Sequence, residues 1–158
     1  MKRKKNRNGR KTTMLIALAS DHGGYDLKEA VKKHLEARGI ETLDLGTDTA
    51  AVSVDYPKYG ELCGRTVASG KADLGVVCCG TGIGISMAAN KVPGVRCGLC
   101  TDTYMATMTK RHNNANILAL GGRVLTVDEA LPIVDAWLDT EFEGGRHQRR
   151  IDMLDDIR

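Results

Sequence analysis

Five short apolar segments that alternate with longer amphipathic segments limit the possible folds of this chain more than any other feature. The apolar segments cover 14–20, 40–46, 73–80, 95–100 and 116–122. The segments between them carry apolar residues at helical spacing, as at Leu27, Val31 and Leu35. Strands that alternate with helices form a parallel sheet that is covered on both faces. The sequence therefore predicts an α/β fold with a five-stranded parallel sheet.

The helical segments follow the strands in chain order. They are expected at 25–39, from the DYP turn to about 68, from the glycine turn to about 90, from about 103, at 127–139 and at 146–157. No linker or internal repeat divides residues 14–158, which we expect to form one domain. With 42% hydrophobic and only 4% aromatic residues, the core must consist mostly of aliphatic side chains.

The charge of the chain is unevenly distributed. Seven of the 23 Lys and Arg residues lie in 1–11, so the remainder carries 16 basic and 20 acidic residues. Residues 1–13 are expected to be a disordered basic tail, although a nucleic-acid or membrane-surface arm and an expression artefact stay open. The acidic body predicts no nucleic-acid partner, and no apolar run is long enough to predict a membrane span.

Five cysteines, an odd number, lie mostly in apolar segments: Cys63, Cys78, Cys79, Cys97 and Cys100. Without an evident secretion signal, this pattern favours reduced thiols in a cytoplasmic protein. Cys97 and Cys100 form a C-x-x-C string, but residues three apart on a strand face opposite ways. A metal or redox site there is therefore disfavoured, and no other metal-binding motif is evident.

Parallel sheets of this kind bind ligands beyond the carboxyl ends of their strands. The candidates at such ends are Asp21 and His22, the segment Cys79 to Gly84, Asp102, and Arg123. Gly80, Gly82 and Gly84 form a glycine-rich turn before a helix, where backbone amides favour an anion. A dinucleotide-binding turn and a purely structural turn are the alternatives, but the G-x-G-x-G spacing differs from the dinucleotide fingerprint.

Cys79 ends the third strand directly before this turn, where a helix N-terminus lowers a thiol pKa. It is therefore a candidate base or nucleophile, with an inert buried thiol as the alternative. Cys78 points to the opposite face and is assigned to the core. Arg146 and Arg150 share one helix face and suit phosphate, although a solvated charged helix explains them equally well.

Taken in order, five segments closely resemble the type B ribose-5-phosphate isomerases, a family that includes allose- and galactose-6-phosphate isomerases. They are SDHGGYDLK (20–28), DYPKYG (55–60), CCGTGIGISMAANK (78–91), RHNNANILALGGR (111–123) and EFEGGRHQRR (141–150). The resemblance covers about 14–153. It implies a Rossmann-like three-layer α/β/α sandwich, no cofactor or metal, and a homodimer or tetramer whose sites are shared between subunits.

The same resemblance implies a role for each matching residue. Cys79 would move a proton between carbons 1 and 2 beside Thr81, and His112 would open the sugar ring with help from Asp21. The implied substrate contacts are Asp21, His22, Tyr56, Gly80, Thr81, Gly82, Ile83, Gly84, Asn113, Arg123, Arg146 and Arg150. Some members use an acidic residue as the base, whereas this chain follows the cysteine pattern.

The expected activity is the interconversion of ribose 5-phosphate and ribulose 5-phosphate through an enediolate. The same chemistry on allose 6-phosphate or galactose 6-phosphate is the nearest alternative, because the motifs do not distinguish these sugars. Galactose-6-phosphate isomerases divide their catalytic parts between two different subunits, whereas Cys79, His112 and the arginines lie on one chain here. A nucleotide-binding regulatory module that keeps the glycine turn is the alternative of a different class.

Overall fold

The computed structural model describes residues 13–157 and confirms the five-stranded parallel sheet. Its strands are β1 Leu15–Ser20, β2 Glu41–Asp44, β3 Leu74–Cys79, β4 Cys97–Leu99 and β5 Ile117–Gly121. They lie in the order β2-β1-β3-β5-β4, and every neighbouring pair is parallel. The predicted basic tail at 1–13 lies outside the described residues except for Thr13.

Each predicted strand is present but somewhat shorter than expected. Past Asp44, the last residue of β2, the chain stays beside β1: the Leu45 amide donates to the Leu18 carbonyl and the Thr47 amide donates to the Ser20 carbonyl, both at 2.8 Å. At the edge strand β4, the side-chain amide of Asn90 pairs with both backbone groups of Cys97, at 2.8 and 2.9 Å. Backbone and side-chain hydrogen bonds thus extend beyond the regular strands, and the apolar pattern alone does not show where the regular pairing ends.

The helices also match the predicted order. They are α1 Tyr25–Ala37, α2 Tyr56–Ala68, α3 Ile83–Asn90, α4 Thr103–Asn113, α5 Val127–Asp139 and α6 Arg146–Asp155, with a short 3-10 turn η1 at His22–Gly24. Local caps set several of the ends. Thr126 and Glu129 form a capping box at the start of α5, and Asn114 ends α4 with a positive φ of 43°.

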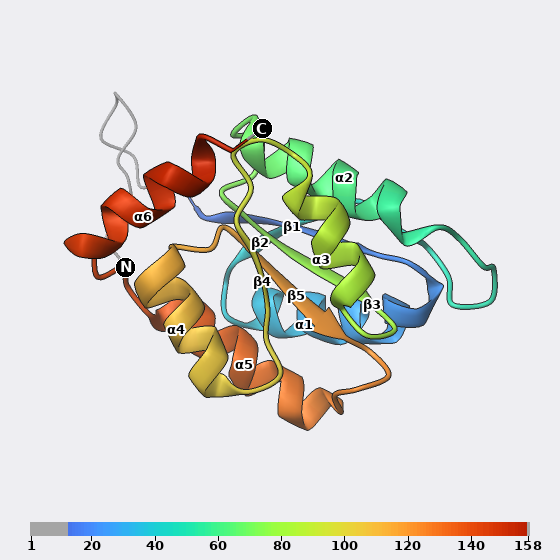
Figure 1. The fold of residues 1–158 in the computed structure, drawn as a ribbon. Helices are drawn as coiled ribbons and strands as arrows, with labels where there is room; N and C mark the ends of the chain where they lie inside the picture. The colour runs from blue at the N-terminus through green and yellow to red at the C-terminus, as the bar shows by residue number, and fades with distance from the viewer. Residues whose placement is uncertain (1–12, 158) are drawn as a thin grey trace.

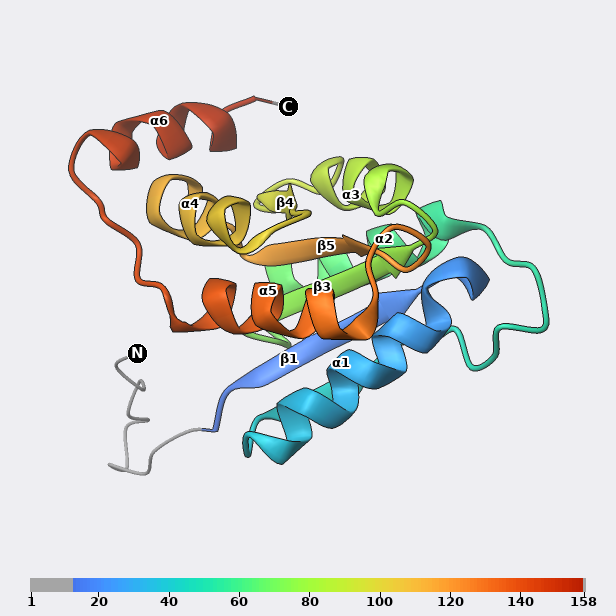
Figure 2. The same ribbon diagram turned by 90° about the horizontal axis from the view of Figure 1, so that it is seen from below.

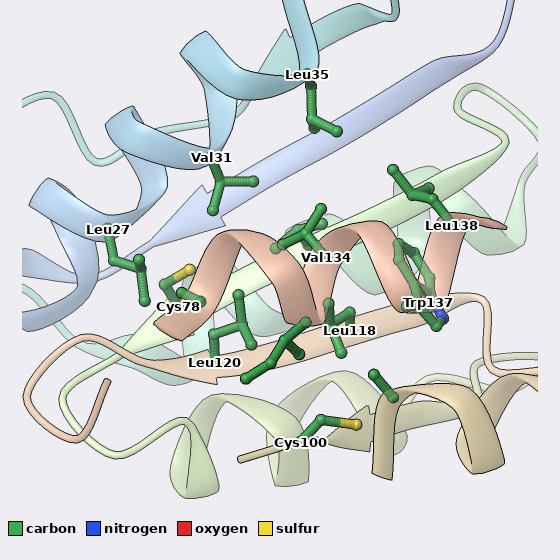
Figure 3. Packing of buried hydrophobic residues seen from close by; sticks show 14 of the residues in the cluster. Leu27, Val31, Leu35, Cys78, Cys100, Leu118, Leu120, Val134, Trp137 and Leu138 are labelled. Carbon is green, nitrogen blue, oxygen red and sulfur yellow. The ribbon is translucent and has the colours of Figure 1, made fainter. Parts of the chain in front are cut away.

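Helices cover both faces of the sheet, as predicted (Figures 1 and 2). On one face, α1 and α5 pack over the strands with Ala106 of α4, and Trp137 is fully buried among leucines and valines (Figure 3). On the other face, α2 and α3 bury a second cluster that includes Cys63 and Ile85. The resulting architecture is the three-layer α/β/α sandwich that the family resemblance implied.

Strand alternation separates the cysteines as predicted. Cys78 and Cys100 belong to the cluster under α1 and α5, whereas Cys79 and Cys97 lie in or against the cluster under α2 and α3. All five cysteines are free thiols. The C-x-x-C string therefore places its two sulfur atoms on opposite faces of the sheet, where they cannot share one ion.

The last helix, α6, lies outside the three layers and against α4 rather than against the sheet (Figure 2). Only His147 and Ile151 are buried on it, and they are four residues apart on one helical face. Among residues 13–157, no helix has the length and apolar character that crossing a bilayer requires.

Candidate active site

The carboxyl ends of β1, β3 and β5 are joined by backbone hydrogen bonds. The amide of Asp21 donates to the Cys78 carbonyl at 3.3 Å, and the amides of Gly122 and Arg123 donate to Cys79 and Gly80 at 2.8 and 2.9 Å. From this edge, β1 leads to α1 on one face and β3 leads to α3 on the other. Such a divergence leaves a crevice between neighbouring strands, where ligands of α/β proteins bind.

The thiol of Cys79 lies at this edge and meets the glycine-rich turn. Its Sγ accepts a hydrogen bond from the Gly82 amide, with 3.1 Å between sulfur and nitrogen. Gly82 adopts a φ of 78°, and a Cβ placed there would lie 2.6 Å from Leu99 Cδ1. Only glycine fits both the backbone angle and the space, so the turn that reaches the sulfur depends on this residue.

The turn continues directly into the amino end of α3. The helix begins at Ile83 without a side-chain cap, and the Ile83 amide is held by Thr81 Oγ1 at 3.2 Å. Amides at such a helix start carry partial positive charge and point away from the helix body. The sulfur of Cys79 therefore shares its surroundings with groups that stabilise negative charge.

The other cysteines lack this setting. Burial raises the pKa of Cys63 to about 12 and raises the pKa of Cys78, which is fully buried. Cys78 contributes to the core, as predicted. Cys79 is 4% exposed and accepts the hydrogen bond from the turn, so the two adjacent thiols have different environments.

Several predicted side chains surround the turn. A Cβ on Gly80 would lie 3.2 Å from Arg123 Nη1, and one on Gly84 would lie 2.6 Å from Tyr56 Cζ, so both side chains lie against the turn. Nearby, Asp21 Oδ1 accepts from the Gly24 amide at 3.0 Å. We call this group the first half-site; it comprises Asp21, His22, Tyr56, Cys79, Gly80, Thr81, Gly82, Ile83, Gly84 and Arg123.

The remaining predicted residues gather at the end of α4 and the start of α6. The imidazole of His112 stacks on that of His147, with ring centroids 4.2 Å apart and planes 12° from parallel. Arg146 and Arg150 are exposed on α6, as is Asn113 at the end of α4. His112, Asn113, Arg146 and Arg150 form the second half-site.

Within one chain, the two half-sites lie at opposite ends of the strands. The first lies at their carboxyl ends and the second lies beyond their amino ends. Gly121 of β5 pairs with Cys79, whereas Ile117 pairs with Gly75 at the other end of β3, about 13 Å away at 3.3 Å per residue. His112 precedes Ile117 and lies beyond that amino end. In both ribbon views, β5 points away from α6 (Figures 1 and 2).

From the sequence, His147 had no predicted role beyond its place in the EFEGGRHQRR motif. The structure buries it to 4% exposure beneath His112, and burial followed by the nearby charges of His112 and Arg146 lowers its pKa. Its four-residue spacing from Ile151 was the available signal for a buried face. No sequence rule, however, predicts that a buried histidine of one helix meets a histidine of another.

Ligand atoms of His112, Glu143 and His147 lie within 4.8 Å of one another, a separation at which three side chains can hold one metal ion. The nearly parallel imidazole planes direct their in-plane lone pairs side by side instead of toward one point. Glu143 also forms an ion pair with Arg111 at 2.9 Å. The geometry is that of a stacked pair next to an ion pair and not of a preformed chelating site.

Asp102, the remaining candidate at a strand end, has a local structural function. Its Oδ1 accepts from the Met105 amide at 2.7 Å and caps the start of α4. A dinucleotide-binding turn would need this carboxylate for a ribose hydroxyl. The observed cap removes that support for the dinucleotide alternative.

Comparisons with known proteins identify the family of the chain. Residues 16–154 match the family described as Ribose/Galactose Isomerase. The chain is 48% identical to a putative sugar phosphate isomerase of Bacillus subtilis, over 90% of this chain and 96% of the relative. It is 45% identical to ribose-5-phosphate isomerase B of Escherichia coli, over 88% and 93% of the two chains.

Solved structures show the same similarity. A ribose-5-phosphate isomerase B from Clostridium thermocellum superposes with a TM-score of 0.89 at 53% identity, covering 91% of this chain and 97% of the other. One from Mycoplasma genitalium with bound ribulose-5-phosphate gives a TM-score of 0.87 at 41% identity, covering 91% and 95%. This chain is therefore an isomerase that belongs to the ribose/galactose isomerase family.

Proposed function

We propose that this isomerase interconverts ribose 5-phosphate and ribulose 5-phosphate, with Cys79 as the base. The observation that carries the proposal is the hydrogen bond from the Gly82 amide to Cys79 Sγ at the amino end of α3, which has no side-chain cap. A thiolate there is stabilised by the amide and by the helix start. The names of the Escherichia coli and Mycoplasma genitalium relatives support this substrate over a six-carbon one.

The proton transfer follows from this geometry. The thiolate takes the proton from carbon 2 of the open-chain aldose, which leaves an enediolate. The thiol then gives this proton to carbon 1 while the proton of the 2-hydroxyl passes to the oxygen on carbon 1, which yields the ketose and restores the thiolate. Negative charge develops on the substrate oxygens during both steps. We assign the stabilisation of that charge to backbone amides of the turn from Gly80 to Gly84, because it is the principal electrostatic requirement of such a reaction.

The substrate must be opened and held before this step. We assign ring opening to His112, with Asp21 assisting, since a histidine transfers protons near neutral pH. Arg146 and Arg150, together with His22 and Arg123, would bind the phosphate. A firm hold on the distant phosphate positions carbons 1 and 2 against the thiol, which lowers the entropic cost of reaction.

Since the half-sites lie at opposite ends of the strands in one chain, a second copy must supply the missing half-site. We infer a homodimer in which the second half-site of one copy meets the first half-site of the other. Large apolar side chains on α3 and α4 support a contact surface: Ile83 is 47%, Met87 62% and Tyr104 71% exposed. Exposed apolar groups near a functional edge are typical of interfaces between subunits.

A substrate panel tests this function. Ribose 5-phosphate, allose 6-phosphate and galactose 6-phosphate are supplied separately, with and without EDTA, and ketose formation is followed in a coupled assay. We expect the highest kcat/KM with ribose 5-phosphate and no effect of EDTA. Turnover of none of the three sugars would refute the isomerase assignment, whereas preference for a six-carbon sugar would change only the substrate.

A further inference from the structure

Arg96 connects two helices that carry the second half-site. Its Nε donates to the Asn113 carbonyl at 2.9 Å and one Nη donates to the Asn114 carbonyl at 3.3 Å. The other Nη contacts both carboxylate oxygens of Asp155, at 2.9 and 2.8 Å. The side chain is only 16% exposed. One guanidinium thus binds the carboxyl end of α4 and the last turn of α6.

The position of Arg96 is itself fixed by the sheet. Its backbone amide donates to Asn116 Oδ1 at 2.8 Å, and its carbonyl accepts from the Asn116 amide at 3.0 Å. Arg96 directly precedes β4, and Asn116 directly precedes β5. The guanidinium is therefore anchored to the amino edge of the sheet rather than to a mobile surface loop.

The final turns of α6 have little other support. Beyond Ile151 the apolar side chains are exposed, with Met153 at 63% and Leu154 at 48%. A cavity of about 490 Å³, lined in part by Leu154, Ile157 and Thr109, lies between this end of α6 and the body of the protein. The ion pair with Asp155 consequently holds an end of the helix that hydrophobic packing does not hold.

We propose that Arg96 is a positioning residue that fixes α6 relative to α4. His112 and Asn113 lie at the end of α4, and Arg146 and Arg150 lie on α6. The position of α6 relative to α4 therefore sets the distance between the ring-opening and the phosphate-binding groups. Binding energy from the phosphate aids the reaction only while that distance is constant. The inference rests on the proposed function, since it assumes that the two groups hold one substrate.

The contact of Arg96 with α6 and its contacts with α4 can be removed separately. Removing the Asp155 carboxylate frees α6 but leaves the guanidinium on the α4 carbonyls, whereas removing the guanidinium frees both helix ends. A contact that only stabilised the fold would lower the melting temperature and leave the phosphate affinity of the folded protein unchanged.

The test compares Asp155→Asn and Arg96→Lys with Glu61→Gln, which removes an exposed ion pair with Arg65 on α2 as a matched control. The measurements are kcat and KM for ribose 5-phosphate, calorimetric binding of inorganic phosphate, and hydrogen exchange of the α6 amides. For Asp155→Asn we expect KM and the phosphate Kd to rise together by roughly three- to tenfold, with kcat within about twofold and faster exchange in α6.

Arg96→Lys loses the planar fork and should also reduce kcat, because the α4 end carrying His112 is no longer held. Glu61→Gln should match the parent protein in every measurement. An unchanged phosphate Kd in Asp155→Asn would overturn the positioning role, as would a loss of kcat with KM and Kd unaltered. If the parent protein binds phosphate but converts no sugar, the proposed function fails while the phosphate and exchange data still test Arg96.

Discussion

The sulfur of Cys79 accepts a hydrogen bond from the backbone amide of Gly82, three residues further along the chain, at 3.1 Å. The bond ties the end of β3 to the turn that starts α3, and it places the thiol where helix amides favour negative charge. Cys78, its neighbour in sequence, points into the opposite core and has no such contact.

The two adjacent thiols should therefore respond differently to substitution. Cys79→Ala is expected to lower kcat by at least about a hundredfold, because it removes the proposed base. Cys78→Ala should retain near-parental kcat and lose stability, by about 1–3 kcal/mol, because it creates a small cavity in the core. Steady-state kinetics and chemical denaturation of both variants provide the measurement. The opposite assignment of the losses would show that the wrong thiol was chosen.

Mixing two inactive variants tests the proposal that each site is shared between two chains. Cys79→Ala and His112→Asn should each abolish most activity in a homodimer. In a mixed dimer, one site would combine both substitutions and the other would combine neither. Random exchange of equal amounts should therefore restore about a quarter of the parental activity, since about half of the dimers are mixed and half of their sites are intact.

The control for this experiment is a mixture of Cys79→Ala with Cys79→Ser, which restores no intact site under any arrangement. Size-exclusion chromatography with light scattering measures whether the parent protein and the variants form the proposed dimer. A failure of the first mixture to recover activity, after demonstrated subunit exchange, would place Cys79 and His112 of each site on the same chain.

Arg150 and Arg149 form a matched pair on α6 for testing the phosphate contact. Arg150 shares a helix face with Arg146, whereas Arg149 points elsewhere. Arg150→Ala should raise KM for ribose 5-phosphate by roughly tenfold with a smaller change in kcat, because it removes the proposed charge-assisted contact to the phosphate. Arg149→Ala should leave KM within about twofold. Equal KM values for the two variants would argue against the assigned contact.

Lys110 predicts a pH dependence of stability that is separate from catalysis. Burial, followed by the charge of Arg96, lowers the pKa of Lys110 to about 8. Its Nζ lies 5.1 Å from the centre of the Trp137 ring and donates to the Ala115 carbonyl at 3.4 Å. Between about pH 8 and the usual lysine pKa of about 10.4, the unfolded chain binds the proton and the folded one does not.

The contribution of Lys110 to the free energy of unfolding therefore increases as the pH rises through this window, and below it the fold must hold a buried charge. Lys110→Met should be more stable than the parent at pH 7, and its advantage should shrink toward pH 10. Urea denaturation at several pH values measures the difference. A constant advantage across this range would contradict the lowered pKa.

Much of the fold was predictable from local pattern because strand and helix periods are properties of short segments. The alternation that separates Cys78 from Cys79 follows from the two-residue period of a strand, and the α/β order follows from apolar runs between amphipathic ones. Asp21, Cys79 and Arg123 were predicted as neighbours because parallel strands bring their carboxyl ends to one edge.

The arrangement of the second half-site was decided only by the tertiary structure. His112 lies in the last turn of a helix that returns to the amino ends of the strands, so a rule about carboxyl ends cannot place it. Motifs alone do not reveal that it lies far from Cys79. Its stack on His147 and the link from Arg96 to Asp155 join residues 35 and 59 positions apart. Such contacts depend on how helices pack, which no local period encodes. The sequence by itself determined which residues are available for chemistry, and packing determined that one chain holds them in two separate halves.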